Sequence, residues 1–142
     1  MSKPRGVRNN NPGNIDRTRT VWQGEDRTAA ALASEARFAV FTSAAYGFRA
    51  IAKILMTYQN KHGLRTVAGL IGRWAPPSEN DTAAYVAQVS RALGVEPDAS
   101  VDVGAPATAF QLAKSIARHE NGGDFWPDQT IWEGLRLAGI KR

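Results

Sequence analysis

The chain has 142 residues, of which 43% are hydrophobic and 22% charged, and this fits one globular domain rather than a disordered segment. It contains no Cys, so disulfides, thiolate metal sites and Cys nucleophiles are excluded. The net charge of +5 favours an anionic partner, such as nucleic acid, anionic lipid or an anionic cell-wall polymer.

The N-terminal stretch is basic and rich in turn residues. It begins MSKPRGVRNNNPGNI, without the apolar segment or the cleavage site of a secretory signal. No apolar run reaches the roughly 20 residues that cross a bilayer. Asn9–Asn14 contains three consecutive Asn before Pro and Gly, which predicts a tight turn. Two extended pieces, around Thr18–Trp22 and Arg37–Phe41, are expected to pair as a small antiparallel β-hairpin.

The remainder is expected to be helical, because apolar residues recur there at helical spacing between start and stop signals. Five helices are predicted: from a Ser43 cap to Gly63, from a Thr66 cap to Ala75-Pro76-Pro77, from Asp81 or Thr82 to Gly94, from Pro106 to about Asn121 before Gly122-Gly123, and from an Asp128 cap through Ala138. A polar loop separates the third from the fourth. The sequence therefore predicts one mainly α domain over residues 1–142, with a turn and β element over 1–42 and a helical lobe over 43–142.

Glu120 occupies an unusual position at the end of the fourth predicted helix. At 100° per residue, the apolar residues Ala109, Ala113, Ile116 and Ala117 fall within about 60° of it. The opposite face carries the polar residues Gln111, Lys114, Ser115 and Arg118. Burial and the helix dipole both raise the pKa of a carboxyl at this place, as a general acid working near neutral pH requires. The alternative is a Glu120 side chain that turns into solvent or pairs with an Arg.

The segment Arg118–Gly122 (RHENG) resembles the His-Glu-Gly segment of phage-type lysozymes, in which the Glu ends a helix and acts as the general acid. More broadly, the chain resembles a family of small phage and prophage proteins, described as virion structural proteins or peptidoglycan hydrolases. The segments that carry this wider resemblance are Arg5–Ile15, Trp22–Gly24, Phe38–Ala50 and Arg73–Asp81. It implies a bacteriophage context and a lysozyme-like, bacteriolytic activity of the endolysin or virion-associated type.

The order of the predicted elements differs from that of ordinary lysozyme-like folds. There the helix with the acid precedes the β-hairpin, whereas here the hairpin is N-terminal and the Glu120 helix C-terminal. The resemblance therefore implies a circularly permuted lysozyme-like arrangement. Such an arrangement requires Glu120 to lie close to the Asn9–Trp22 element.

A glycosidase with paired carboxylates needs a second Asp or Glu across the cleft. Asp16, Glu25 and Asp26 lie in the N-terminal element, and Asp124 and Asp128 follow Glu120. Glu25 and Asp26 are expected in a solvated turn. No second carboxylate stands out, which favours a lytic transglycosylase, in which one Glu acts as acid and then base while the C6 hydroxyl of the substrate closes the ring. A muramidase with an N-terminal Asp remains open.

Candidate substrate-binding residues surround this acid. The amides of Asn10, Asn11 and Asn14 suit the N-acetyl and hydroxyl groups of a glycan, although a turn scaffold would also explain them. Trp22, Trp74 and His119 are further candidates, and Trp74 is the first choice because a rigid Pro-Pro loop follows it. With two His and no Cys, the chain is not expected to bind zinc or another cofactor.

The sequence thus predicts a glycosidase that cleaves the MurNAc-β-1,4-GlcNAc bond of peptidoglycan with Glu120 as general acid. We expect a monomer made in the bacterial cytoplasm that acts on the cell wall or periplasm, or is carried in the virion. The alternative is a non-enzymatic virion or nucleic-acid-binding module, for which six Lys and Arg in the first 27 residues provide a phosphate footprint. Against nucleic acid, no recognised motif and no basic stripe along the helices is present.

Overall fold

Seven α-helices form within residues 3–142, which are the residues that the computed structural model describes. Their bounds are Arg5–Arg8 (α1), Ala29–Ser34 (α2), Ala44–His62 (α3), Val67–Trp74 (α4), Thr82–Leu93 (α5), Pro106–Asn121 (α6) and Asp128–Leu137 (α7). In this part of the chain, β-structure is limited to isolated bridges. The domain is mainly α, as predicted.

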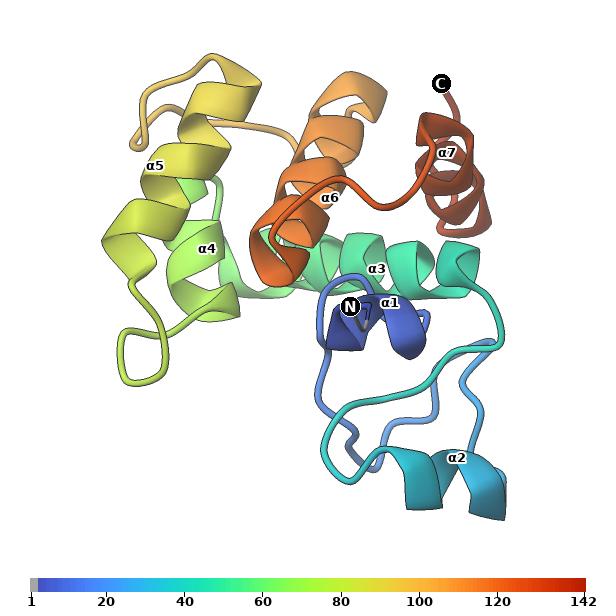
Figure 1. Ribbon diagram of the computed structural model, residues 1–142. Helices are drawn as coiled ribbons and strands as arrows, with labels where there is room; N and C mark the ends of the chain where they lie inside the picture. The colour runs from blue at the N-terminus through green and yellow to red at the C-terminus, as the bar shows by residue number, and fades with distance from the viewer. Residues whose placement is uncertain (1–2) are drawn as a thin grey trace.

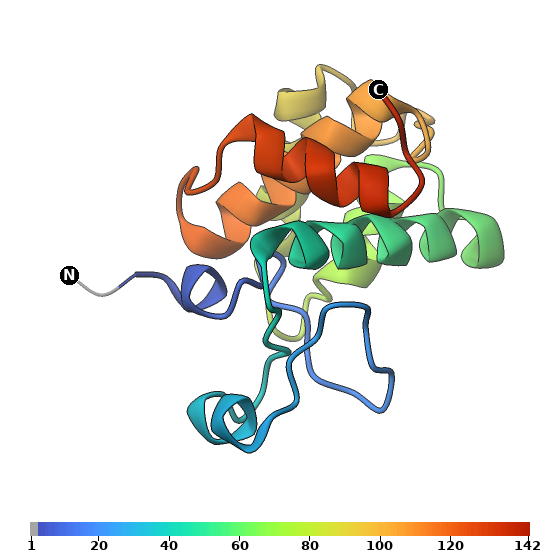
Figure 2. The same ribbon diagram turned by 90° about the vertical axis from the view of Figure 1, so that its right-hand side faces the viewer.

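The long helix α3 runs across the middle of the molecule (Figure 1). Helices α5, α6 and α7 lie on one side of α3, and the N-terminal segment with α2 lies on the other side (Figures 1 and 2). Helix α6 lies between α5 and α7 and packs against both, whereas α7 lies along α3. A Cβ at Gly134 of α7 would overlap the Cβ of Phe48 in α3, so glycine permits this close approach.

The main core lies between these helices. Helices α3, α4, α5, α6 and α7 all contribute side chains that are almost completely buried, among them Phe48, Ile51, Leu70, Ile71, Tyr85, Val89, Leu112, Ile116, Ile131 and Leu135. Burial of an aliphatic or aromatic side chain contributes roughly 1.5 to 3 kcal/mol each. This core holds α6, and with it Glu120, in a fixed place relative to α3, α4 and α5.

Most helices of the helical lobe, residues 43–142, begin and end where their signals predict. The side chains of Thr66 and Asp81 accept hydrogen bonds from backbone amides in the first turns of α4 and α5. Helices α3, α5 and α6 end at glycines in the left-handed conformation, namely Gly63, Gly94 and Gly122. The predictions for these termini are confirmed.

Two details of the helical lobe differ from expectation. Asp128 does not cap α7, because Pro127 occupies the cap position and the Asp128 carboxylate instead accepts a 2.9 Å hydrogen bond from Lys114. Ser115 was expected on the polar face of α6 but is only 4% exposed. Because α5 packs against α6, a larger part of the α6 surface is buried than a helix with a single apolar face would bury.

The N-terminal segment has no regular hairpin. The Arg37–Phe41 piece forms two isolated antiparallel bridges, Asp16 with Phe38 and Glu25 with Phe41, whose partners flank the predicted strand. The expected first strand, Thr18–Trp22, is an irregular loop between these bridges. The prediction was right about Arg37–Phe41 and wrong about its partner segment.

Helices α1 and α2 were not predicted, because they are too short for a periodic apolar pattern. Glu35, which follows α2, fixes this region. Its carboxylate is 4% exposed and accepts two 2.6 Å hydrogen bonds from Arg5, one of 3.0 Å from Asn9, and one each from the amides of Arg37 and Phe38. The ion pair with Arg5 holds the pKa of Glu35 far below its usual range. Glu35 thereby links α1 to the segment that carries Arg37.

Candidate active site

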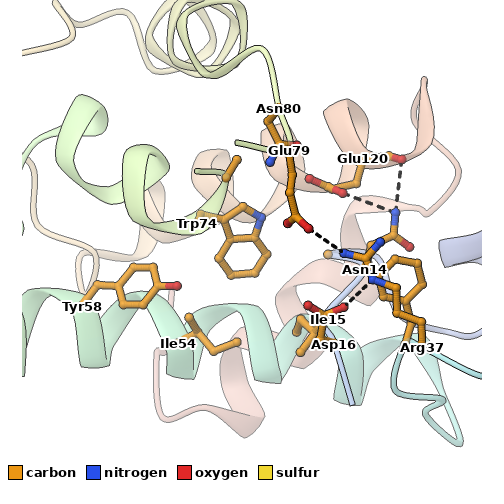
Figure 3. A pocket seen from close by; sticks show the side chains of 13 residues that line it. Asn14, Ile15, Asp16, Arg37, Ile54, Tyr58, Trp74, Glu79, Asn80 and Glu120 are labelled. Carbon is orange, nitrogen blue, oxygen red and sulfur yellow. Dashed lines mark hydrogen bonds and ion pairs between the residues drawn. The ribbon is translucent and has the colours of Figure 1, made fainter. Parts of the chain in front are cut away.

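A cleft of about 330 Å³ lies where the N-terminal segment meets α3, α4 and the end of α6 (Figure 3). Its walls are formed by Gly13, Asn14, Ile15, Asp16, Arg37, Phe38, Ile54, Tyr58, Trp74, Ala75, Glu79, Asn80 and Glu120. Three of the predicted site residues, Asn14, Trp74 and Glu120, therefore share one cleft.

Glu120 lies in the last turn of α6, and its carboxyl group faces the cleft (Figure 3). Its Oε2 accepts a 3.0 Å hydrogen bond from the Tyr85 hydroxyl, and its Oε1 accepts one of 3.3 Å from Asn14 Nδ2. Burial raises the pKa of Glu120, and hydrogen bonds from Tyr85, Asn14 and Trp74 offset only part of that effect. The side chain is thus held by donors at the cleft wall and does not extend into bulk solvent.

Tyr85 of α5 supports this carboxyl, and His119 of α6 packs in turn on Tyr85. The Tyr85 side chain is 0% exposed, and burial together with the charge of Glu120 raises its pKa, so the hydroxyl keeps its proton and donates it in a hydrogen bond. The His119 ring stacks on Tyr85 with 3.7 Å between centroids, and its Nδ1 lies 2.6 Å from Oε1 of Gln88. His119, predicted as a substrate-binding residue, lies outside the cleft lining and instead holds Tyr85.

The Asn9–Asn14 turn places one side-chain amide in the cleft, and the side chains of Asn10 and Asn11 stabilise the turn through hydrogen bonds to the backbone. Asn10 and Asn14 have left-handed backbone conformations, with φ of 50° and 47°. Asn11 is fully buried and donates a 2.8 Å hydrogen bond to the carbonyl of Ala39, while Asn10 donates to the carbonyl of Phe41. Of the three predicted amides, only Asn14 lines the cleft.

Trp74, at the end of α4, also lines the cleft (Figure 3). It packs against Gly13 of the Asn9–Asn14 turn. A Cβ at Gly13 would lie 2.8 Å from Cζ2 of Trp74 and 3.0 Å from Cγ1 of Ile51, so this position has no space for a larger residue. Trp22 packs instead against a separate small apolar cluster that contains Phe41, and it does not line the cleft.

Two further carboxylates, Asp16 and Glu79, lie in the cleft with Glu120 (Figure 3). Nε of Arg37 lies 2.9 Å from Oδ1 of Asp16, and Nη2 of Arg37 lies 3.8 Å from Oε1 of Glu79. Asp16 was one of the predicted candidates for a second carboxylate. Glu79 and Arg37 were not predicted as site residues, because they lie 42 positions apart in the sequence and meet only in the folded chain.

The other candidate carboxylates lie elsewhere. Glu25, Asp26, Asp124 and Asp128 do not line the cleft. The expectation of a solvated turn is wrong for Glu25, whose side chain is 0% exposed and accepts a 2.6 Å hydrogen bond from Arg27. Asp16 is therefore the N-terminal carboxylate that shares a cleft with Glu120.

The contact between Asn14 and Glu120 joins residues 106 positions apart and places Glu120 beside the Asn9–Trp22 element. Within residues 3–142, no three Asp, Glu, His or Cys side chains gather closely enough to bind a metal ion. In the same part of the chain, no helix has the length and apolar character needed to cross a membrane.

No protein-family model matches the chain. The chain is similar to a protein named Protein P5 from Pseudoalteromonas phage PM2, with 42% identity over 94 residues. The match covers 64% of this chain and 56% of that protein, so the chain spans little more than half the length of its relative. This similarity supports the bacteriophage context that the sequence implied.

Proposed function

We propose that the chain is a lysozyme-like glycosidase that cleaves the MurNAc-β-1,4-GlcNAc bond of peptidoglycan, with Glu120 as its general acid. The observation that carries this proposal is a carboxyl with a raised pKa, held at the wall of a cleft by Tyr85 and Asn14. A general acid must be protonated near the working pH and must reach the leaving oxygen. The raised pKa of Glu120 supports the first requirement, and its place at the cleft wall supports the second.

Proton transfer from Glu120 to the glycosidic oxygen allows the bond between that oxygen and C1 of MurNAc to break. In the transglycosylase route, the C6 hydroxyl of the same sugar then attacks C1 and returns its proton to Glu120. In the muramidase route, water attacks C1 and its proton passes to a second carboxylate. Asp16 is the candidate for that carboxylate because it shares the cleft and comes from the opposite element.

Asn14 is suited to form a hydrogen bond with Glu120 in both of its protonation states. Its Nδ2 donates to Oε1 of Glu120, while its Oδ1 is buried and has no hydrogen-bond partner among the described residues. Rotation of the amide by 180° exchanges these two atoms, so that Oδ1 accepts the proton of a neutral Glu120. The same side chain thus supports Glu120 as a carboxylate and as an acid.

The charge of the cleft favours an uncharged sugar over a phosphate backbone. Asp16, Glu79 and Arg37 line it together with Glu120, so its net charge is negative even with Glu120 protonated, although the whole chain carries a net charge of +5. A polyanion entering the cleft would therefore meet like charges. The N-terminal phosphate footprint is also reduced, because Arg5, Arg17 and Arg27 bind groups of the chain itself. Both observations weigh against the nucleic-acid alternative.

The test compares wild type with Glu120→Gln on permeabilised Gram-negative cells and purified sacculi, with loss of turbidity as the readout. Glu133→Gln is the matched control, since Glu133 is an exposed glutamate of α7 whose ion pair with Arg136 lies outside the cleft. We expect Glu120→Gln to lose at least about a hundredfold in rate, the scale of a general acid. Equal lysis by both variants would refute the role of Glu120, and absence of lysis by wild type would refute the activity.

Mass spectrometry of the fragments then decides the route. A transglycosylase leaves 1,6-anhydro ends and retains its rate in Asp16→Asn. A muramidase leaves reducing ends and loses its rate in Asp16→Asn. Thermal unfolding controls for misfolding: Glu120→Gln is expected to be at least as stable as wild type at pH 7, because a carboxyl with a raised pKa in the folded state destabilises that state once ionised.

A further inference from the structure

We propose that a second site, the groove between α5 and α6, binds the carboxylate-bearing stem peptides of the polymer whose glycan the cleft cleaves. This inference rests on the proposed function. The groove has a volume of about 820 Å³ and is lined by Gln88, Arg91, Ala92, Gln111, Lys114, Ser115, Arg118, His119, Gly122, Gly123 and Asp124. None of these residues lines the cleft.

Three cations and one carboxylate line this groove, so its charge is opposite to that of the cleft. Arg91 of α5 forms no ion pair within residues 3–142. Arg118 is 61% exposed and lies 3.7 Å from Asp124, a distance at the outer limit of an ion pair. Lys114 is already paired with Asp128 at 2.9 Å, so Arg91 and Arg118 are the cations of the groove that an anionic ligand can bind.

The uncharged groups in the groove favour a peptide over nucleic acid. The amide of Gln111 offers both donors and an acceptor, as the backbone of a bound peptide requires. The groove contains no Trp, Tyr or Phe on which a base could stack. The two guanidinium groups, from Arg91 and Arg118, match carboxylates through paired hydrogen bonds. An acidic peptide satisfies all three features.

The two sites meet at the end of α6. Glu120 faces the cleft, while its neighbours Arg118 and His119 face the groove. Peptidoglycan has the matching composition, with uncharged glycan strands that carry acidic peptides. The α6 terminus would therefore contact both components of one polymer, the glycan through the cleft and the peptides through the groove.

The experiment measures binding of the full chain to insoluble sacculi by co-sedimentation, in a Glu120→Gln background that prevents cleavage. The test variant adds Arg91→Gln and Arg118→Gln, and the matched control adds Arg65→Gln and Arg142→Gln, which are exposed and line neither the groove nor the cleft. Both pairs remove the same charge. We expect the groove variant to bind about tenfold more weakly and the control to remain within about twofold.

Two further probes identify the ligand. On glycan strands stripped of peptide by an amidase, the groove and control variants are expected to bind equally. A duplex DNA competitor is expected to leave binding to sacculi unchanged at physiological salt. The inference fails if the groove variant binds intact sacculi like the control, if it still differs from the control on stripped strands, or if DNA displaces the protein.

These outcomes separate the groove from the proposed function. Lysis that depends on Glu120, without any effect of the groove charges on binding, refutes only the groove. Binding that depends on the groove, without lysis by the wild type, refutes only the glycosidase. Both arginines are exposed, and circular dichroism of the variants is expected to match that of wild type.

Discussion

Removal of one hydroxyl group, in Tyr85→Phe, tests how the protein controls its candidate acid. The ring keeps its buried place and its stacking on His119, so the change is confined to the 3.0 Å hydrogen bond with Glu120. A hydrogen bond to a charged acceptor is worth about 1.5 to 3 kcal/mol. This bond favours the ionised form, and its loss is expected to raise the pKa of Glu120 further.

The expected consequence for stability depends on pH. Below the unfolded-state pKa of a glutamate, near 4.3, Glu120 is protonated in both folded and unfolded chains and the ionised form contributes nothing. As the pH rises, the folded variant must ionise Glu120 without the Tyr85 donor. Tyr85→Phe is therefore expected to lose about 1.5 to 3 kcal/mol in free energy of unfolding at high pH and less at pH 4.

Two measurements check this reasoning. Carbon-13 NMR of labelled glutamate carboxyls, with Glu120→Gln for assignment, follows the titration of Glu120 directly and needs no activity. The pH profile of lysis provides the second readout, and its alkaline limb is expected to move to higher pH. Tyr58→Phe is the matched control, because Tyr58 also lines the cleft but forms no hydrogen bond with Glu120 in the described residues. An unchanged or lowered pKa of Glu120 in Tyr85→Phe would refute the reasoning.

Two further substitutions test the scaffold of the cleft. Glu35→Gln is expected to cost about 1.5 to 3 kcal/mol, the scale of hydrogen bonds to a charged group, because Arg5 is half exposed, and to lower Tm by roughly 3 to 12 °C. Because the pKa of Glu35 is lowered in the folded state, the difference in free energy of unfolding between wild type and variant is largest above the unfolded-state pKa. It shrinks as the pH falls below about 4. A difference that does not depend on pH would contradict this prediction. Gly13→Ala is expected to displace Trp74, cost about 1 to 3 kcal/mol and slow lysis. In the control Gly72→Ala, the added methyl meets open space, so equal effects of the two changes would argue against displacement.

The sequence was informative where structure is determined by near neighbours. Caps such as Thr66 and Asp81, terminal glycines and a helical apolar period fix α3 to α7 locally, and these elements were predicted close to their observed bounds, although Pro127 rather than Asp128 caps α7. The N-terminal segment is different. Its conformation depends on hydrogen bonds such as that of Asn9 with Glu35, 26 residues away, and no short sequence window contains them.

The same distinction applies to the candidate site. The helical period alone placed Glu120 on the buried face of α6, and the Pro-Pro loop drew attention to Trp74. Tyr85 appeared as an ordinary inward residue of α5, and only the packing of α5 on α6 brings its hydroxyl to Glu120. Glu79 likewise becomes a cleft residue only when the loop after α4 lies beside Arg37. Such contacts follow from tertiary structure and leave no local pattern.

The hydrogen bond between Asn14 and Glu120 has a consequence for folding kinetics. It closes a loop of 106 residues, whereas the packing of α5 on α6 joins segments much nearer in sequence. The entropy of closing so long a loop opposes early formation of this contact, and contacts between distant residues slow folding. We therefore expect the helical lobe to assemble before the N-terminal segment docks on it. In that order α6 is in place while one wall of the cleft is still missing, and Glu120 gains its contact with Asn14 late in folding.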